Sequence, residues 1–141
     1  MQAVLDRNIV VSAAISPKGP PAEILRAWRS GAFTWVSSPP LLAELERTLR
    51  SPRLRKYVNW SAAEAAEFLS LLRQSARIVE PGVAIDVISA DPSDNRVLEA
   101  AAEAGADYIV SGDSDLLQLR SYEDIAIVPA TRFVAIIVAG L

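Results

Sequence analysis

Short apolar runs alternate along the chain with amphipathic segments, which predicts strands that alternate with helices. Residues 33–36, 108–111 and 125–128 have the length and character of buried strands. After Ser61, apolar residues recur at helical spacing and mark a longer helix; they are Ala65, Phe68, Leu69, Leu72 and Ala76. Strands alternating with helices favour a parallel sheet with helices on both faces, so the expected fold class is α/β.

Start and stop signals place the other elements. Ser38 is expected to cap a helix that begins at two prolines, and Gly105 to end the helix that Asp91-Pro92-Ser93-Asp94 opens. Further helices are expected at 8–15, 20–29, 113–119 and from 129 onward, and further strand candidates at 3–5, 78–79 and 83–89. No repeat or long linker interrupts the 141 residues, which predicts a single domain over 1–141.

Composition narrows the possible chemistry. The chain has no histidine and no cysteine, which excludes Ser-His-Asp triads, thiolate catalysis, disulfides and zinc sites built from these residues. Its net charge is −3, so contact with nucleic acid would have to come from local basic patches. Carboxylates, hydroxyls, lysine, arginine and a hard metal ion remain available for catalysis.

The sequence also lacks a recognisable membrane or export segment. Its first residues do not combine a basic region with a long apolar run, and the apolar C-terminal stretch of residues 133–141 is too short to cross a bilayer. We therefore expect a soluble cytoplasmic protein in which the C-terminal stretch packs on the core.

Several acidic residues fall where a parallel sheet binds its ligands, at the carboxyl ends of the strands. Asp6 follows the first strand and Asp113 follows the strand at 108–111. Asp94 lies in the first turn of its helix on the apolar side, and Glu44 lies one turn into its helix beside an apolar face. We expect these four carboxylates to gather at one edge of the sheet.

A purely structural role is the alternative for each acid. Asp6, Asp91 and Asp113 could be helix N-caps, and Asp94 could complete a capping box with Asp91. We interpret Asp91 as a cap. Glu44 lies too far into its helix to cap, and its structural role would be a solvated pair with Arg47 or Thr48.

A gathered cluster would favour a divalent cation. Carboxylates held close together repel one another and raise one another's pKa values, and a bound cation removes this repulsion. An all-oxygen site without histidine or cysteine suits Mg²⁺ or Mn²⁺. Such ions can activate water and stabilise charge on a phosphodiester, so a hydrolase of phosphodiesters is the leading hypothesis.

Three blocks of the sequence resemble the PIN-domain family: VLDRNIVVSAAISPKGPP, SSPPLLAELERTL and DPSDNRVLEAAAEAGADYIVSGDSDLL. They cover nearly the whole chain in the family's order and spacing, and they are most similar to the branch of toxins from toxin–antitoxin systems. The resemblance implies a three-layer α/β/α sandwich with a central parallel sheet and metal-dependent cleavage of RNA. It also implies a cognate antitoxin protein as a partner and a homodimer.

The family's functional residues carry over onto matching positions of this chain. The resemblance implies a catalytic set of Asp6, Glu44, Asp94 and Asp113. It implies Mg²⁺ or Mn²⁺ as cofactor, with the ligands Asp6, Asp94, Asp113 and Asp115. Asn8 matches an asparagine expected to brace the first loop, and Ser111 matches a small hydroxyl residue before the late aspartate.

Arg7 departs from the family pattern, which usually has threonine or serine after the first aspartate. A hydroxyl there could hold a water or a phosphate, whereas arginine brings a fixed positive charge to a cation site. Arg7 could contact the scissile phosphate, weaken metal binding or point away. If it abolished catalysis, the chain would be an inactive PIN-fold module that binds RNA or protein, although an inactive site has no reason to keep four mutually repelling acids.

A basic stretch with nearby aromatic residues is the candidate for RNA contact. It contains Arg47, Arg50, Arg53, Arg55 and Lys56, followed by Tyr57 and Trp60. Basic side chains can bind phosphates and aromatic rings can stack on exposed bases, so we expect Arg7, Arg53, Arg55 and Lys56 to contact substrate. The alternative is a solvated helix end whose aromatic residues belong to the core, as we expect for Trp28, Phe33 and Trp35.

Two other acidic α/β folds fit less well. A receiver-type signalling domain needs a lysine after a late strand, and the only lysines are Lys18 and Lys56. A haloacid-dehalogenase-like phosphatase needs Asp-x-Asp after the first strand, where this chain has Asp6-Arg7-Asn8.

Overall fold

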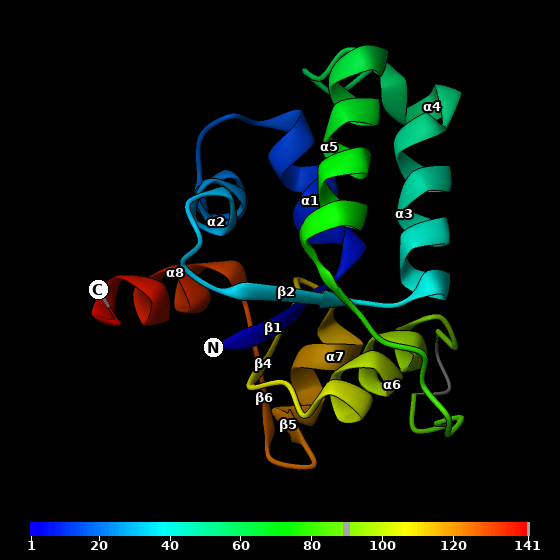
Figure 1. Ribbon diagram of the computed structural model, residues 1–141, viewed down its shortest axis with the longest axis vertical. Coiled ribbons are helices and arrows are strands. Elements are labelled where there is room, and N and C mark those ends of the chain that lie inside the picture. The colour runs from blue at the N-terminus through cyan, green and yellow to red at the C-terminus, as the bar shows by residue number, and fades with distance from the viewer. Residues whose placement is uncertain (89–90, 141) are drawn as a thin grey trace.

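A six-stranded sheet runs through the middle of the molecule (Figure 1). The computed structural model describes residues 1–88 and 91–140. In spatial order the strands are β3 (Arg77–Ile78), β2 (Thr34–Ser37), β1 (Gln2–Leu5), β4 (Tyr108–Val110), β6 (Ile125–Val128) and β5 (Ser121–Tyr122). Neighbouring strands are parallel except β5 and β6, which form an antiparallel edge.

Helices cover both faces of this sheet, which confirms the expected three-layer α/β/α class. One layer contains α1 (Arg7–Ile15), α2 (Pro20–Arg29), α3 (Pro39–Arg50), α5 (Ala62–Ser75) and α8 (Ala130–Ala139). The other contains α6 (Asp94–Ala104) and α7 (Ser114–Leu119), and the short α4 (Pro52–Arg55) connects α3 to α5. The sheet is therefore mixed but mostly parallel, with one antiparallel strand that the periodicity did not predict.

The two faces of the sheet bury different kinds of core. The larger core includes Trp28, Phe33 and Trp35, as expected, and Trp28 packs edge-on against Trp35 with ring centroids 5.0 Å apart. The second core, under α6 and α7, consists of aliphatic residues and alanines. Alanines at Ala100 and Ala101 let α6 lie close to the sheet, which places the first turn of α6 beside the ends of β1 and β4.

The capping signals in the sequence have the predicted effects. Ser61 and Glu64 form a reciprocal capping box at the start of α5, and the Ser38 side chain accepts a hydrogen bond from the Leu41 N–H. Gly105 ends α6 in the left-handed region, with φ of 62°. These local rules fix where the helices begin and end, and hence which residues lie at the sheet's carboxyl edge.

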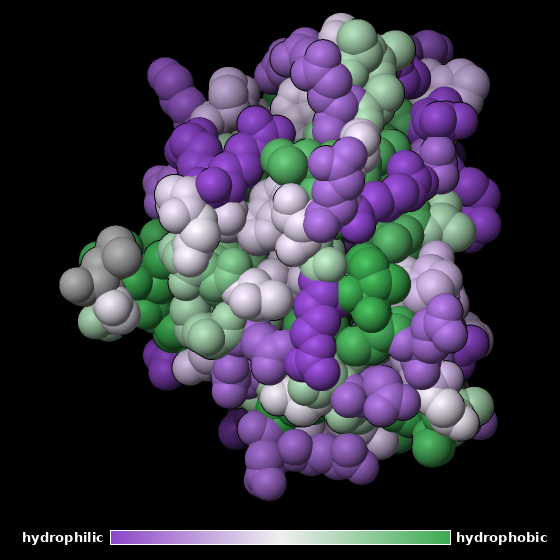
Figure 2. All heavy atoms as spheres, in the orientation of Figure 1, coloured by the Kyte–Doolittle hydropathy of each residue, from purple (hydrophilic) through white to green (hydrophobic). Residues whose placement is uncertain are grey.

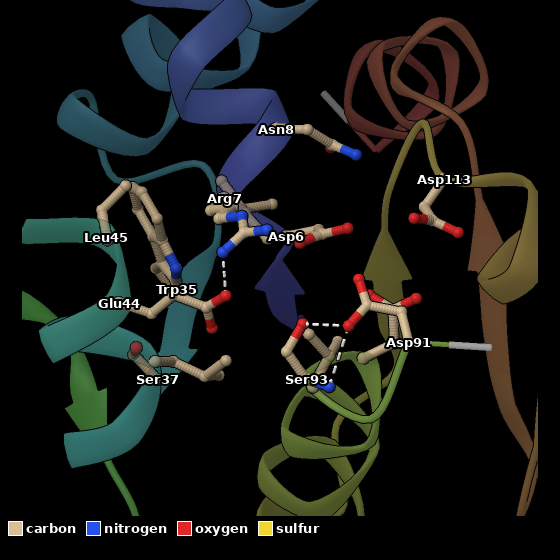
Figure 3. Close-up of a pocket in the computed structure, with 14 residues that line it drawn as sticks. Asp6, Arg7, Asn8, Trp35, Ser37, Glu44, Leu45, Asp91, Ser93 and Asp113 are labelled. Atoms are coloured by element: carbon tan, nitrogen blue, oxygen red, sulfur yellow. Dashed lines mark hydrogen bonds and ion pairs between the residues drawn. The ribbon is translucent and has the colours of Figure 1, made fainter. Parts of the chain in front are cut away.

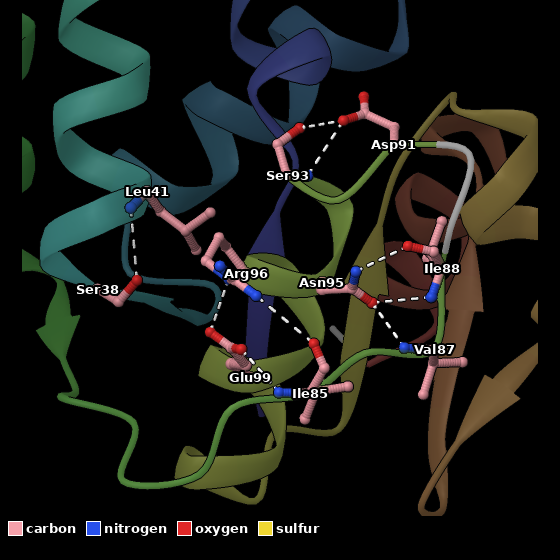
Figure 4. Close-up of polar contacts among 10 residues, drawn as sticks. All are labelled: Ser38, Leu41, Ile85, Val87, Ile88, Asp91, Ser93, Asn95, Arg96 and Glu99. Carbon is pink, nitrogen blue, oxygen red and sulfur yellow. Dashed lines mark hydrogen bonds and ion pairs between the residues drawn. The ribbon is translucent and has the colours of Figure 1, made fainter.

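The strand expected at 83–89 is wrong over residues 83–88, and residue 89 lies outside the described residues. This segment crosses the surface of α6 and hydrogen-bonds to its side chains (Figure 4). The Asn95 side-chain oxygen accepts the Val87 and Ile88 N–H groups, and Glu99 accepts that of Ile85 at 2.8 Å. Side chains of α6 therefore satisfy the backbone donors of Ile85, Val87 and Ile88, in place of a sheet ladder.

Strand β5 was also absent from the expectations, because it is only two residues long. It is formed by a tight hairpin at Glu123 and Asp124, whose φ values of 47° and 68° are those of a turn that reverses the chain between paired strands. No helix within the described residues is long and apolar enough to span a membrane.

The C-terminal helix α8 packs in the larger core. This confirms the expected packing of the C-terminal stretch over residues 133–140, and residue 141 lies outside the described residues. Phe133 is fully buried between Phe33 and Tyr108, at centroid distances of 5.1 and 5.7 Å. It joins α8 to two segments that are far apart in the sequence.

We expect Phe133→Ala to lower the free energy of unfolding by about 3–5 kcal/mol, because it leaves a cavity in the core. Val138→Ala on the same helix is the matched control, since Val138 is 63% exposed. It should change stability by less than about 0.5 kcal/mol. Urea denaturation followed by tryptophan fluorescence measures both; equal effects would contradict the packing described for α8.

Candidate active site

A small pocket opens at the carboxyl edge of β1 and β4, between α3 and the start of α6 (Figure 3). Its volume is about 110 Å³. The polar lining consists of Asp6, Arg7, Asn8, Ser37, Glu44, Asp91, Ser93, Asp94 and Asp113. The pocket therefore brings together all four acids of the expected catalytic set, from four separate segments of the chain.

Three carboxyl groups converge most closely. Asp91, Asp94 and Asp113 each place an oxygen within 4.8 Å of the others. Asp94 extends from the first turn of α6, Asp113 follows β4, and Asp91 lies in the turn before α6. Their oxygens are close enough together to bind one divalent cation, and without one their charges repel.

Asp94 is the most perturbed member of this group. Its side chain is 5% exposed, and among the described residues its Oδ2 is one of two buried side-chain atoms that lack a hydrogen-bond partner. Burial, followed by the charges of Asp113, Asp6, Asp91 and Asp115, raises its pKa to about 7. The capping alternative is wrong for Asp94, since an unpartnered buried oxygen caps nothing.

Asp6 lies behind this group at the end of β1 and is nearly fully buried. Its Oδ2 accepts a hydrogen bond of 2.7 Å from the Ser111 hydroxyl. Burial raises the pKa of Asp6, whereas the hydrogen bond from Ser111 and the nearby Arg7 lower it. Asp6 occupies the N-cap position of α1, but its side chain makes no capping hydrogen bond. Its carboxylate therefore does not cap the helix.

Ser111 and Asn8 hold the loop that carries Asp113. The Ser111 oxygen accepts the Asp113 N–H at 2.9 Å while its hydroxyl donates to Asp6, so a single side chain connects two of the acids. The Asn8 side-chain oxygen accepts the Gly112 N–H at 3.3 Å. Asn8 was expected to brace the first loop; the hydrogen bond that the structure shows for its side chain is to the loop after β4.

Asp113 both caps a helix and lines the pocket. One of its oxygens accepts the Asp115 N–H at 2.7 Å and so caps α7. Asp115, an expected metal ligand, lies half-buried in the first turn of α7 and is not among the residues that line the pocket. Its charge nevertheless contributes to the raised pKa of Asp94, so it acts on the site from a greater distance.

The sequence pattern indicates only a cap at Asp91, whereas in the structure its carboxylate belongs to the cluster. One oxygen accepts hydrogen bonds from both the N–H and the hydroxyl of Ser93, at 3.1 and 2.7 Å (Figures 3 and 4). These bonds lower the pKa of Asp91 and fix its side chain in the turn before α6. The Asp-Pro-Ser sequence directly before Asp94 is the signal that could have placed both carboxylates together, since such a turn folds back on itself.

Glu44 faces the pocket from α3 and forms an ion pair with Arg7. The expected structural alternative, a pair with Arg47 or Thr48, is wrong: Thr48 donates to the backbone carbonyl of Glu44, and the carboxylate binds Arg7. Arg7 is directed at Glu44, away from the three converging acids (Figure 3). Arg7 was expected to contact the phosphate, to weaken metal binding or to point away. In the structure its guanidinium points away from Asp91, Asp94 and Asp113.

None of the more distant basic residues expected to contact substrate lines this pocket. Arg53 lies in an adjoining hollow that also contacts Arg7, whereas Arg55 lines a separate groove against α5. Lys56 follows α4 as an exposed residue. Trp60 packs against Phe68 with ring centroids 4.9 Å apart and is thus attached to the core.

Comparison with known protein families identifies the chain. The model of the PIN domain matches residues 2–115, which include every acid of the pocket. This chain belongs to the PIN domain family. A curated relative of this PIN domain protein is the uncharacterized protein MJ1680 of Methanocaldococcus jannaschii, 32% identical over 120 residues, or 85% of this chain and 76% of the relative.

A solved structure shares the PIN fold of this chain. It is the crystal structure of VapBC2 from Rickettsia felis bound to a DNA fragment from their promoter. The match has a TM-score of 0.59, covers 92% of this chain and 98% of the other, and has 14% sequence identity. At this identity the likeness is one of fold, and it agrees with the layers described above.

A divalent cation fits the residues present. Asp94 Oδ2 is a buried oxygen without a hydrogen bond, and it lies beside the carboxylates of Asp91 and Asp113. A cation there would give that oxygen a partner and offset the repulsion that raises the pKa of Asp94. The donors are all oxygen, which suits Mg²⁺ or Mn²⁺.

The raised pKa of Asp94 predicts that metal-free protein loses stability as pH rises. Folded Asp94 keeps its proton up to a pH of about 7, whereas the unfolded chain releases it near 3.8. The folded state therefore binds more protons within that window, and the free energy of unfolding falls from about pH 4 to about pH 7. Asp94→Asn should remove most of this fall and raise Tm in EDTA at pH 8 by about 3–6 °C.

Thermal unfolding from pH 4 to 8, with EDTA or with Mn²⁺, measures this effect. Mn²⁺ at pH 8 should raise the Tm of the wild-type protein but not that of Asp94→Asn. Asp86→Asn removes an exposed acid from the loop before α6 and serves as the control. If Asp94→Asn kept the pH dependence of the wild-type protein, the placement of Asp94 in a repelling cluster would be wrong.

Proposed function

We propose that this PIN domain protein is a metal-dependent ribonuclease that hydrolyses RNA phosphodiester bonds at the acidic pocket. The convergence of Asp91, Asp94 and Asp113 around a buried oxygen without a hydrogen bond carries the proposal. The matched family is generally one of nucleases, and the sequence resemblance to its toxin branch makes RNA the expected substrate.

Asp94, Asp113 and Asp91 would bind Mg²⁺ or Mn²⁺, with Asp6 close behind them. The cation would supply positive charge beside the scissile phosphate and lower the cost of forming hydroxide from water. Asp115 would support the site through its charge, not as a direct ligand, because it lies outside the pocket lining. Asp91 would thus be a ligand in place of Asp115, which the resemblance implies.

The other pocket residues would position the acids and the substrate. Ser111 donates to Asp6 Oδ2 and thereby fixes the orientation of that carboxyl group. Asp6, with a pKa raised by burial, is suited to accept a proton from water during hydrolysis. Glu44 holds Arg7 at the mouth of the pocket, where the guanidinium can exchange this ion pair for a phosphate oxygen.

A toxin–antitoxin role follows as a second part of the proposal. The fold of the chain is shared with VapBC2, and the sequence resembles the toxin branch. We infer that a cognate antitoxin protein binds this chain, that two copies form a homodimer, and that cleavage of RNA takes place in the cytoplasm. Co-expression with the product of an adjacent gene, followed by size-exclusion chromatography, tests the two associations.

An inactive PIN-fold module that binds RNA or protein is the second candidate, and Arg7 is the observation that favours it. The Arg7–Glu44 pair occupies one wall of the pocket and brings a fixed positive charge near a cation site. The intact acidic cluster favours catalysis over this alternative, since four nearby carboxylates without a cation destabilise the fold.

Purified protein should cleave labelled single-stranded RNA with Mn²⁺ or Mg²⁺ and not with EDTA. Asp94→Asn should lower the rate about 100-fold or more, because loss of a metal ligand removes several kcal/mol of charge stabilisation. Asp86→Asn, prepared identically, removes one exposed acid and should leave the rate unchanged.

Equal cleavage by the wild-type protein and Asp94→Asn would identify a contaminating nuclease. Absence of cleavage together with absence of Mn²⁺ binding by calorimetry would overturn the catalytic proposal. In that case Arg7→Thr would show whether arginine at this position is the cause, since threonine restores the residue type expected in the family.

A further inference from the structure

A second hollow adjoins the acidic pocket on the side of α3 and α4. Its volume is about 500 Å³, and its lining consists of Arg7, Arg47, Thr48, Ser51, Arg53, Leu54 and Tyr57. Arg7 lines both this hollow and the acidic pocket, so the two adjoin at that side chain. Thr48 lies one helical turn beyond Glu44 on α3. The same helix therefore lines both the acidic pocket and the hollow.

The charge of the hollow is opposite to that of the pocket. Arg47 and Arg53 are exposed, and within residues 1–88 and 91–140 neither forms an ion pair. Arg50 on the same helix, in contrast, is paired with Glu46 at 3.0 Å. The hollow thus holds two guanidinium groups whose charges no carboxylate of the described chain offsets.

Tyr57 adds an aromatic surface to these cations. Its side chain is 67% exposed, although Trp60, three residues later, is attached to the core. The Tyr57 N–H donates to the Leu54 carbonyl at 2.9 Å, so the ring is carried by a closed turn at the end of α4. An exposed ring that lines the same hollow as Arg47 and Arg53 offers a surface for stacking.

We propose that this hollow is a subsite for the single-stranded RNA that flanks the cleaved bond, with a base stacked on Tyr57 and the adjoining phosphate held by Arg47 and Arg53. The subsite rests on the proposed function, which places the scissile phosphate in the acidic pocket. An aromatic face beside free guanidinium groups binds unstacked bases and backbone phosphates together. A base can reach Tyr57 only when it is out of a duplex, so single strands are preferred over double strands.

An acidic peptide is the other occupant that two arginines could attract. RNA is favoured because the hollow shares Arg7 with the acidic pocket, so a strand whose scissile bond lies in the pocket has its flanking nucleotides beside the hollow. An acidic peptide has no base to stack on exposed Tyr57 and no phosphodiester to place in the acidic pocket.

The residues of this subsite differ from those expected from the sequence. Arg53 and Arg7 remain, and Arg47 and Tyr57 join them. Arg55 faces the groove against α5, and Lys56 lines neither surface. Position along the chain groups these cations together, whereas the turn at α4 distributes them over different faces.

The test is binding of a fluorescent 12-nucleotide RNA, measured by anisotropy in EDTA, where no cleavage interferes. Tyr57→Leu and the double variant Arg47→Ala, Arg53→Ala should each weaken binding about five- to fifty-fold, and Tyr57→Phe should keep it near that of the wild-type protein. Arg132→Ala removes one exposed charge from α8 and should have little effect. The same RNA annealed to its complement should bind more weakly than the single strand.

Hydrolysis assays with Mn²⁺ separate this proposal from the proposed function. Tyr57→Leu should raise the KM for RNA while leaving hydrolysis of bis(p-nitrophenyl) phosphate unchanged, because that small diester does not reach the hollow. If the wild-type protein hydrolyses both substrates and Tyr57→Leu binds and cleaves RNA equally well, the subsite is wrong and the nuclease remains. If RNA binding depends on Tyr57 but nothing is hydrolysed, the subsite stands and the nuclease fails. Displacement of RNA by poly-glutamate at equal charge concentration would overturn RNA as the occupant.

Discussion

Repulsion among the carboxyl groups at the end of the sheet is the constraint on which the site depends. Asp94 is buried with an oxygen that has no partner, and Asp91 and Asp113 lie within a few ångströms of it. A cluster of this kind destabilises the folded chain as long as its charges are uncompensated. It lies where β1 and β4 end and α6 begins, which is where a cation and a phosphate can be brought into contact.

Hydrogen bonds to neutral groups keep the acids in place despite this repulsion. Ser111 connects Asp6 to the loop of Asp113, Asn8 holds the same loop, and Ser93 fixes Asp91. Residues 85–88 are attached to α6 by hydrogen bonds to Asn95 and Glu99 (Figure 4). These hydrogen bonds hold the like-charged carboxylates in place despite their repulsion. The site is therefore preorganised before a cation binds.

The charge of the surface changes sign across a single ion pair. On one side of the Arg7–Glu44 pair lie the aspartates, and on the other lie Arg47 and Arg53. Polar and apolar side chains are interspersed over the face shown in Figure 2, with polar groups abundant around α3 and α4. A protein with a net charge of −3 can therefore present a local cationic surface next to an anionic pocket, which its overall charge conceals.

Alternation of apolar runs with amphipathic segments determined the α/β class, because periodicity and caps such as those at Ser38, Ser61 and Gly105 act over a few residues. The resemblance to a PIN domain placed the four acids of Asp6, Glu44, Asp94 and Asp113 in one site, and the structure brings them to one pocket. Only the tertiary structure decided that Asp91 joins them, that Arg7 turns to Glu44, and that Tyr57 faces solvent while Trp60 packs inward. Those outcomes depend on where loops from distant segments meet, and side-chain direction in a loop follows from its partners in space, not from its neighbours in sequence.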